Sequence, residues 1–488
     1  MSVATAQPTA ARSAHKPATG LASLTIQLTA ARFRTREGEG LLYLAGILAY
    51  TIAAALALTV AGGTWAFWNR SQHLAGLHAQ VLAEDATFGT VLGFYVVLAC
   101  IACALLIPAT VNLAAGAAVL GARGRERRLA VLRLMGLSSG EVVKMSLLDA
   151  TIQAIIGGVL GSVIYVATLP LWGNLTMQAV PLSFDEMLLP AWLFATVLLA
   201  LLLVGLFAAW RGLRQVRISP LGVSRRANKP ALSWIRAIVF VVLLAVSGQV
   251  ASSFNPRGDV GPAMMFAAAI VAVVLGINLV APWILQVEAK LWAKLPWPSS
   301  KWAARRIAAD PGATWRRVSG VALLSFIGGF MALMPFQLDP EGEKGSATRT
   351  FVEESQLDFT KGVIITLAVG FVLTATSMLI TQASATIERA EQSQALRRMG
   401  APSAFSLKTM WLETFGPLAL GVVLGAVLGM AMALPMYNFA TKMGVESDSG
   451  MLMIGTVLIV GLLLAAASLL ASHPLYHRLL ATSERRND

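Results

Sequence analysis

Apolar residues occur in ten long runs that are almost free of charge, separated by short polar and mostly basic segments. The hydrocarbon core of a bilayer is about 30 Å thick, which a helix of roughly 20 apolar residues crosses. The pattern predicts an all-α polytopic membrane protein of about ten transmembrane helices, centred on residues 41–62, 88–121, 145–172, 188–210, 237–252, 262–287, 318–337, 362–382, 414–437 and 451–472. Only residues 253–261 separate the fifth and sixth runs, so these two either both cross or form a re-entrant pair.

Basic residues divide unequally between the connecting segments. With the N-terminus inside, the segments on that side hold 32 of the 38 Lys and Arg residues, and such an excess marks the cytoplasmic side. The distribution predicts a multi-pass protein of the plasma or inner membrane with both termini in the cytoplasm. The largest predicted external segment, residues 338–361, carries six acidic residues. A solvated loop is the favoured interpretation, over a site for a cation or a cationic peptide.

Composition excludes several classes of function. A chain with 56% hydrophobic and 13% charged residues cannot hide its apolar surface in a soluble fold. Its net charge of +13 is explained by orientation in the membrane, so no nucleic-acid partner is expected. Cys100 and Cys103 lie in an apolar run with no companion ligands, which predicts no metal site, and no catalytic cluster stands out. Residues 1–40 contain no secretory signal and are expected to form a basic cytoplasmic segment.

The chain contains an internal repeat, because residues 129–164 match residues 393–428 at a constant offset of 264 residues. Charged and glycine positions recur together, which two unrelated apolar helices would not show. An even number of predicted spans separates the copies, so both have the same orientation. The expected organisation is an N-terminal segment, a first four-helix unit, two linking spans, a second four-helix unit and a C-terminal tail, over residues 1–40, 41–215, 216–317, 318–480 and 481–488.

Each copy combines a long span, a basic stretch and a short amphipathic segment. An uninterrupted helix over residues 88–135 would be about 70 Å long and would leave the bilayer as a stalk. Gly136 and Gly400 are suited to end such stalks in the left-handed conformation, and Ser138 and Ser403 to begin the next helix. We expect coupling helices at residues 137–144 and 401–408, where a soluble partner applies force; plain inner-leaflet loops are the alternative. The candidate coupling residues are Arg133, Gly136, Leu137, Ser138, Ser139, Glu141, Lys144, Arg397, Gly400, Ala401, Pro402, Ser403 and Lys408.

Two acidic residues and four glycines recur further along each copy. Asp149 and Glu413 lie about one turn inside the membrane boundary, where an unpaired carboxylate is costly. Structural pairing is favoured over proton transfer, with Lys144 or Arg133 as partner in the first copy and Lys408 or Arg397 in the second. Small residues four positions apart permit close helix packing, which is the role predicted for Gly157, Gly161, Gly421 and Gly425.

The doubled pattern of Leu-Arg-x-Met-Gly, an acidic residue at a helix start and Gly-x-x-x-Gly resembles the FtsX-like permease family of ABC transporters. This is the type VII mechanotransmission group with MacB-like and BceB-like members. The blocks 125–164 and 389–428 carry the resemblance, and the ten-span layout extends it. Two features differ: Arg128 and Gln392 stand where the family usually has Glu, and only residues 338–361 stand where relatives have a large extracytoplasmic domain.

The resemblance implies a permease subunit that is not itself an enzyme. Two copies of a separate cytoplasmic ABC ATPase would dock on the coupling helices and supply the sites for ATP and magnesium. In agreement, the chain has no G-x-x-x-x-G-K-[S/T] motif to bind nucleotide phosphates. The expected activity is export or extraction of an amphipathic or hydrophobic substrate, such as a drug, a lipid-like molecule or an antimicrobial peptide, that enters from the membrane lipids. The alternatives are a signalling subunit that regulates a cell-wall hydrolase or sensor kinase, and a secondary transporter built on repeats.

Overall fold

The computed structural model describes residues 39–85, 88–123, 138–217, 233–253, 260–333, 346–355, 357–400 and 402–442, with isolated positions between 455 and 470. Its long helices are α2 (Glu39–Gln72), α4 (Phe88–Arg123), α6 (Ser139–Trp172), α8 (Ala191–Arg217), α9 (Ile235–Ser252), α10 (Val260–Trp292), α12 (Pro311–Ala332), α14 (Asp358–Arg398) and α15 (Ser403–Lys442). The shorter elements are α3 (Leu77–Glu84), β1 (Thr176–Met177), β2 (Val180–Pro181), α7 (Phe184–Met187), α11 (Pro298–Ala309) and α13 (Ala347–Ser355). The prediction of an all-α protein is confirmed.

Eight helices in the described part of the chain are long and apolar enough to cross a membrane. They lie in α2, α4, α6, α8, α9, α10, α14 and α15. The seventh predicted run forms α12, whose first turns carry Arg316 and Arg317 and which is not among the eight. The tenth run, 451–472, falls largely outside the described residues. A count of ten spans therefore stays a prediction.

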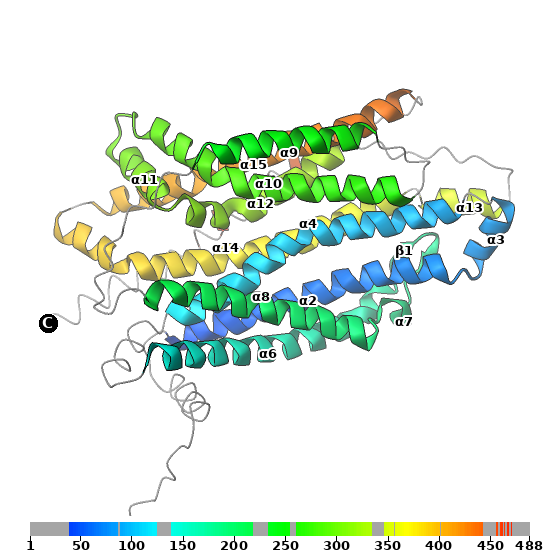
Figure 1. The fold of residues 1–488 in the computed structure, drawn as a ribbon, viewed down its shortest axis with the longest axis horizontal. Helices are drawn as coiled ribbons and strands as arrows, with labels where there is room; N and C mark the ends of the chain where they lie inside the picture. The colour runs from blue at the N-terminus through cyan, green and yellow to red at the C-terminus, as the bar shows by residue number, and fades with distance from the viewer. Residues whose placement is uncertain are drawn as a thin grey trace, which may run out of the picture.

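Three described helices of each predicted unit pack in the same way. In the first unit α2 packs against both α4 and α6, and in the second α12 packs against both α14 and α15. Figure 1 shows the helices running along one axis, so that the bundle has two ends. We call the end where α6, α9, α12 and α15 begin the basic end, on the left of Figure 1, and the opposite end, with β1, β2 and α3, the hairpin end.

The link between the units consists of α9, α10 and α11. Helices α9 and α10 pack along each other, and both have the length and hydropathy of a membrane span. The predicted basic loop after them contains α11, which sequence analysis missed. Proline at its first position favours a helix start, and residues with helical spacing, Ser300, Ala303, Ala304 and Ile307, are buried.

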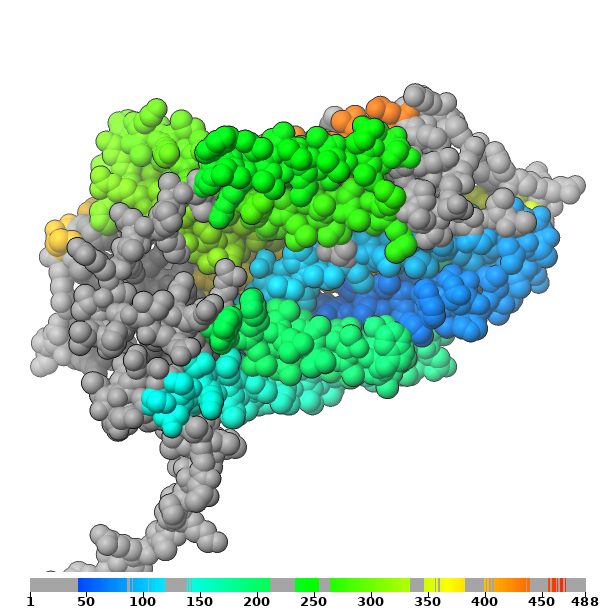
Figure 2. Space-filling view, in the orientation of Figure 1, coloured from blue at the N-terminus to red at the C-terminus, as the bar shows by residue number. Residues whose placement is uncertain are grey.

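Apolar side chains cover both the interior and much of the outer surface. One continuous buried cluster extends through the first unit, the link and the second unit. Large apolar side chains are also exposed on the outer faces of α6 and α9, among them Val159, Val163, Val241 and Val246. In Figure 2, α9 forms the upper surface of the face shown. Exposed apolar belts of this kind are what a bilayer would cover.

Candidate functional site

The first predicted coupling segment begins α6 with a capping box at the basic end. The Ser138 hydroxyl accepts a hydrogen bond from the Glu141 backbone N–H (3.3 Å), while the Glu141 carboxylate accepts one from the Ser138 backbone N–H (2.8 Å). The Ser138 backbone N–H, helped by its hydroxyl (2.8 Å), holds the pKa of Glu141 below its ordinary value. This reciprocal arrangement satisfies donors that a helix start leaves free, and the predicted role of Ser138 as helix start is confirmed.

The second coupling segment follows a left-handed residue. Gly400 has φ +84° and directly follows α14, and α15 begins at Ser403. This conformation suits glycine, which has no Cβ to clash. The structure differs from the prediction in one respect, because each segment runs straight into the following long helix instead of forming a separate coupling helix. Residues 141–149 and 403–413 contain neither glycine nor proline, so nothing ends the helix there.

Several predicted coupling residues cannot be placed. Arg133, Gly136, Leu137 and Ala401 lie outside the described residues, as do the side chains of Ser139, Arg397 and Ser403. Pro402, Lys144 and Lys408 are exposed at the basic end. Two equivalent lysines therefore lie on the surface just beyond the starts of α6 and α15.

Glu413 belongs to a buried ion-pair cluster at the basic end. Its side chain is 1% exposed and lies 3.3 Å from Arg317 on α12 and 3.6 Å from Arg306 on α11. The sequence pattern predicts Lys408 or Arg397 as the partner of Glu413, but the arginines that pair with it come from other helices. Trp302 on α11 also contacts Phe405, with ring centroids 6.3 Å apart. The first turns of α15 are thus tied to both α11 and α12.

The equivalent acid of the first unit has different surroundings. A β-carbon on Gly161 would meet Thr51 and Ala55 of α2, as one on Gly425 would meet Ala322 and Phe326 of α12. Thr51 and Ala55 of α2 are therefore equivalent to Ala322 and Phe326 of α12, an offset of 271 residues in both cases. At the same offset, the residue of α2 equivalent to Arg317 is Gly46. Gly46 faces the fully buried amide of Gln153, one turn from the buried Asp149. Asp149 and Glu413 therefore lie in different environments. The second unit has Arg317 beside Glu413, whereas the equivalent residue of the first unit is Gly46.

All four duplicated glycines lie where two helices meet. Built β-carbons on Gly157 and Gly161 would overlap atoms of α2, including Tyr50 Cβ and the Thr51 carbonyl oxygen (2.6 Å from Gly161). On Gly425 a β-carbon would overlap the Ala322 carbonyl oxygen of α12, and on Gly421 it would lie 3.2 Å from Ala322 Cβ. The same glycines thus face the equivalent helix in both units, as close packing through small residues requires.

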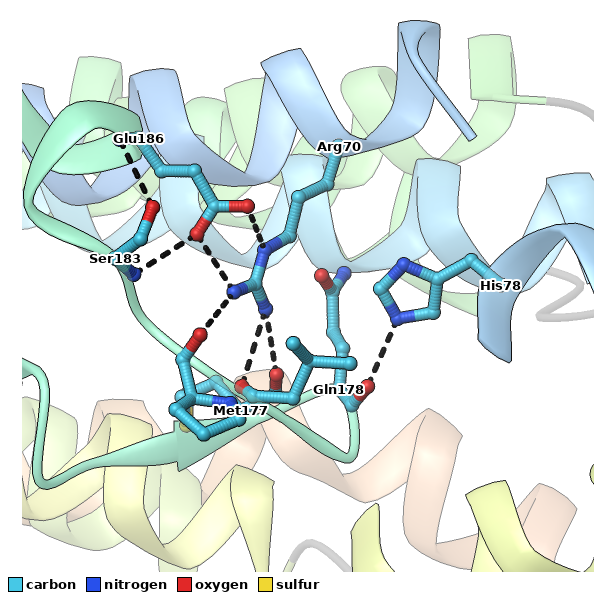
Figure 3. Close-up of polar contacts among 8 residues, drawn as sticks. Arg70, His78, Met177, Gln178, Ser183 and Glu186 are labelled. Carbon is cyan, nitrogen blue, oxygen red and sulfur yellow. Dashed lines mark hydrogen bonds and ion pairs between the residues drawn. The ribbon is translucent and has the colours of Figure 1, made fainter. Parts of the chain in front are cut away.

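A polar junction that sequence analysis missed lies at the hairpin end and involves the β1–β2 hairpin (residues 175–182). Arg70, at the end of α2, is 4% exposed and donates two hydrogen bonds to the Glu186 carboxylate, at 2.8 and 2.9 Å. It also donates to the carbonyl oxygens of Met177 (2.7 Å), Pro181 (2.8 Å) and Val180 (3.4 Å). Figure 3 shows the guanidinium enclosed between the hairpin and α7. Each of its five N–H groups therefore has an acceptor.

The opposite side of the hairpin is held by the second unit. Asp358, 1% exposed at the start of α14, accepts hydrogen bonds from the Gln178 backbone N–H (2.5 Å) and the Tyr95 hydroxyl (3.2 Å). Lys361 donates to the Thr176 carbonyl oxygen (2.8 Å) and lies 3.0 Å from Asp358. We call the contacts of Arg70, Glu186, Asp358 and Lys361 with the hairpin the hairpin junction. It joins α2 of the first unit to α14 of the second.

The turn at the tip of the hairpin is strained. Gln178 and Ala179 have φ values of 58° and 61°, a conformation that costs roughly 1–2 kcal/mol for each non-glycine residue. Hydrogen bonds hold it, since the Gln178 carbonyl oxygen accepts from His78 Nε2 (2.8 Å) and its N–H bonds to Asp358. A strained backbone conformation of this kind persists where several contacts with surrounding residues fix it. This turn lacks the usual Asn-Gly signal, which is why the hairpin was not predicted.

The acidic segment 338–361 is only partly the solvated loop that was expected. Glu353 is exposed and pairs with Arg349 one turn away, but Asp358 is buried in the hairpin junction. Residues 338–345 lie outside the described part. One sequence signal for the junction existed, because Ser183 and Glu186 have capping-box spacing and do form that box at the start of α7.

Acidification is expected to weaken the hairpin junction through Glu186. Burial opposes ionisation, but hydrogen bonds from Arg70 and Ser183 outweigh it and bring the pKa below the ordinary value of 4.5. The stabilisation is then complete above about pH 4.5 and is lost as the pH falls through the lowered pKa. Fluorescence-monitored unfolding of the detergent-solubilised protein measures it, and Glu186→Gln should remove this part of the pH dependence. An identical pH dependence in both proteins would contradict the assignment.

These features define a polytopic helical membrane protein built from two similar units. Residues 111–221, covering the end of α4, α6 and α8, match the family model for the FtsX-like permease C-terminal domain. This part of the chain is therefore similar to FtsX-like permeases, and the match supports a membrane permease component of an ABC-type system. No curated protein matches the chain. Within the described residues no group of His, Cys, Asp and Glu could hold a metal ion. The MacB-like or BceB-like subtype stays a prediction.

Proposed function

We propose that this permease couples ATP hydrolysis by a separate ABC ATPase to export or extraction of an amphipathic or hydrophobic substrate by mechanotransmission. The observation that carries the proposal is the length of α14. Its 41 residues span about 60 Å, twice the hydrocarbon core of a bilayer. Figure 1 shows α14 continuing toward the basic end, where it turns into α15. Such a helix can act as a stalk that leaves the membrane.

The distribution of charged residues between the two ends of the bundle supports a stalk that extends into the cytoplasm. Exposed bases gather at the basic end, including Lys144, Lys301, Arg305 and Lys408, whereas the hairpin end carries Glu84, Asp185, Glu353 and Glu354. By the positive-inside rule the basic end is cytoplasmic. In the proposed assembly two ATPase subunits dock there, on the starts of α6 and α15, and bind ATP and magnesium.

The contacts of Glu413 supply a route from the docking point into the bundle. A force applied to the start of α15 would be transmitted to α12 through the contact of Glu413 with Arg317. It would be transmitted to α11 through the contacts of Glu413 with Arg306 and of Phe405 with Trp302. Buried charge pairs of this kind resist separation, because removing one partner leaves an uncompensated charge. Movement of the stalk and of α15 would therefore displace α12 as well. In the described part of the chain the hairpin end carries only short elements, which favours a substrate that enters from lipid.

Gly400→Pro is expected to uncouple the ATPase, while Gly400→Asn leaves coupling nearly intact. Proline fixes φ near −65° and cannot adopt the +84° of Gly400, whereas asparagine tolerates the left-handed region. A tagged chain purified from its native cells with its ATPase provides the assay. We expect substrate-stimulated ATP hydrolysis to fall by about tenfold or more in Gly400→Pro, equivalent to a coupling loss of about 1.4 kcal/mol.

Three results would contradict the proposal. The first is that no ABC ATPase co-purifies, and the second is that stimulation in Gly400→Pro equals that in Gly400→Asn. The third is a deletion strain with unchanged sensitivity to hydrophobic antibiotics and unchanged lipids but an altered kinase output or cell separation. That outcome would favour the signalling function.

A further inference from the structure

A cavity of about 670 Å³ lies between α4, α9, α10 and α12, and is distinct from the coupling segments and the hairpin junction. Its polar lining comes from the beginnings of α9 and α12 and the later part of α10, at the basic end: Arg236, Gln286, Asp310 and Arg316. The lining farther along α4 and α10 is mainly apolar, with Ile107, Pro108, Val111, Leu275 and Pro282, and also includes the uncharged Asn112 and Asn278. The charged lining residues therefore lie at the basic end, and the rest of the lining is uncharged.

The polar part of the cavity is positively charged. Arg236 has no acidic partner within the described residues. The Arg316 guanidinium folds over the start of α12, since a β-carbon built on Gly312 would lie 3.6 Å from Arg316 Nη1. The carboxylate of Asp310 caps the same helix by accepting a hydrogen bond from the Ala313 backbone N–H (3.0 Å). Among the residues that line the cavity there are two guanidinium groups and one carboxylate, so the formal charge of the lining is positive.

The apolar part of the cavity reaches the outer surface. Ile107 and Leu275 are 57% and 55% exposed, although both line the cavity. On the inner side the wall is held by a hydrogen bond, donated by Trp315 Nε1 to Asn278 Oδ1 (2.9 Å). A ligand can thus keep its polar group beside the arginines while its apolar part extends into the surrounding lipid.

We propose that this cavity binds a glycerophospholipid with an anionic headgroup. Its phosphate would accept charge-assisted hydrogen bonds from Arg236 and Arg316, and an acyl chain would lie against Ile107 and Leu275. Basic pockets between membrane helices on the cytoplasmic side have this preference for anionic headgroups. The lipid would contact α4 of the first unit, α9 and α10 of the link, and α12 of the second unit. It would therefore stabilise the arrangement of the two units, independently of any ATPase.

The test measures stabilisation of the purified chain in neutral detergent by added phosphatidylglycerol. The thermal midpoint of the wild-type protein is expected to rise with phosphatidylglycerol and not with phosphatidylcholine or inorganic phosphate at the same phosphate concentration. Arg236→Gln combined with Arg316→Gln should weaken binding by about tenfold or more, because both charged donors are lost. The matched control, Arg305→Gln on the exposed face of α11, should bind as the wild type does.

A second variant separates lipid binding from folding. Leu275→Trp fills the apolar part of the cavity and retains both arginines, so its midpoint without lipid should match the wild type while the response to phosphatidylglycerol is lost. Equal responses in wild type, the double variant and Leu275→Trp would overturn the proposal. So would equal stabilisation by inorganic phosphate, which would indicate a simple anion site. No step of this test requires an ATPase, so its failure is distinct from failure of the proposed function.

Discussion

Replacing Arg70 with methionine is expected to lower the free energy of unfolding by about 3–5 kcal/mol, the cost of breaking a buried charge pair by removing one partner. Methionine keeps much of the apolar length of the side chain but donates no hydrogen bonds. The Glu186 carboxylate and the carbonyl oxygens of Met177, Val180 and Pro181 would lose their shared donor. Thermal unfolding in detergent, followed by tryptophan fluorescence, measures the loss.

Two companion variants make this result specific. Arg70→Lys keeps the charge but cannot reproduce the five-donor fork of arginine, so an intermediate loss is expected. Arg349→Met removes an arginine at the same end whose carboxylate partner, Glu353, is solvent-exposed, and such pairs contribute about 1 kcal/mol or less. If Arg70→Met were no more harmful than Arg349→Met, the hairpin junction would not be a stabilising element.

The second large effect is expected at Gly425. A β-carbon there would overlap the Ala322 carbonyl oxygen and would lie 3.1 Å from the Phe326 backbone nitrogen. Because these neighbours are backbone atoms of α12, no side-chain rotation relieves the clash, and α12 and α15 must separate. Gly425→Leu should cost about 3 kcal/mol, the upper part of the range for overpacking, and Gly425→Ala a smaller amount. Gly161→Leu should act in the same direction, since it meets α2 in the equivalent way.

The matched control lies on α9. Gly248 has no atom within 4 Å of a built β-carbon, so Gly248→Leu should unfold at the wild-type temperature. Comparing the thermal midpoints of the glycine variants separates a packing defect from a general effect of leucine in a membrane helix. A Gly425→Leu protein as stable as Gly248→Leu would show that α12 and α15 are not in close contact at this point.

Several features of the candidate site could be predicted because local chemistry determines them. Ser138 and Glu141 form a capping box wherever a helix starts at that spacing, and Gly400 is the residue that a left-handed helix end prefers. The repeated glycines indicated close packing before their partners were known. The prediction of separate coupling helices was wrong, since a helix without glycine or proline to end it continues into the following span.

The partners of buried charges could not be predicted in the same way. The partners predicted for Glu413 were bases near it along the chain, but Arg306 and Arg317 are about a hundred residues away. For Arg70, three of the four acceptor groups are backbone carbonyls, and any residue type could supply them. The strained Gln178–Ala179 turn depends on Asp358 and His78, which approach from other elements.

The sequence by itself determined membrane residence, the helical class, the internal repeat and the resemblance to FtsX-like permeases, because exposure to lipid and close helix contact restrict residue types at regular spacings. Only the tertiary structure decided how α2 and α12 face the repeated glycines, which arginines hold Glu413, how the hairpin joins the two units, and where α4, α9, α10 and α12 leave a cavity. These features depend on which helices become neighbours, and packing across the whole bundle decides that. The apolar pattern of a single helix does not, because it is compatible with many arrangements of the other helices.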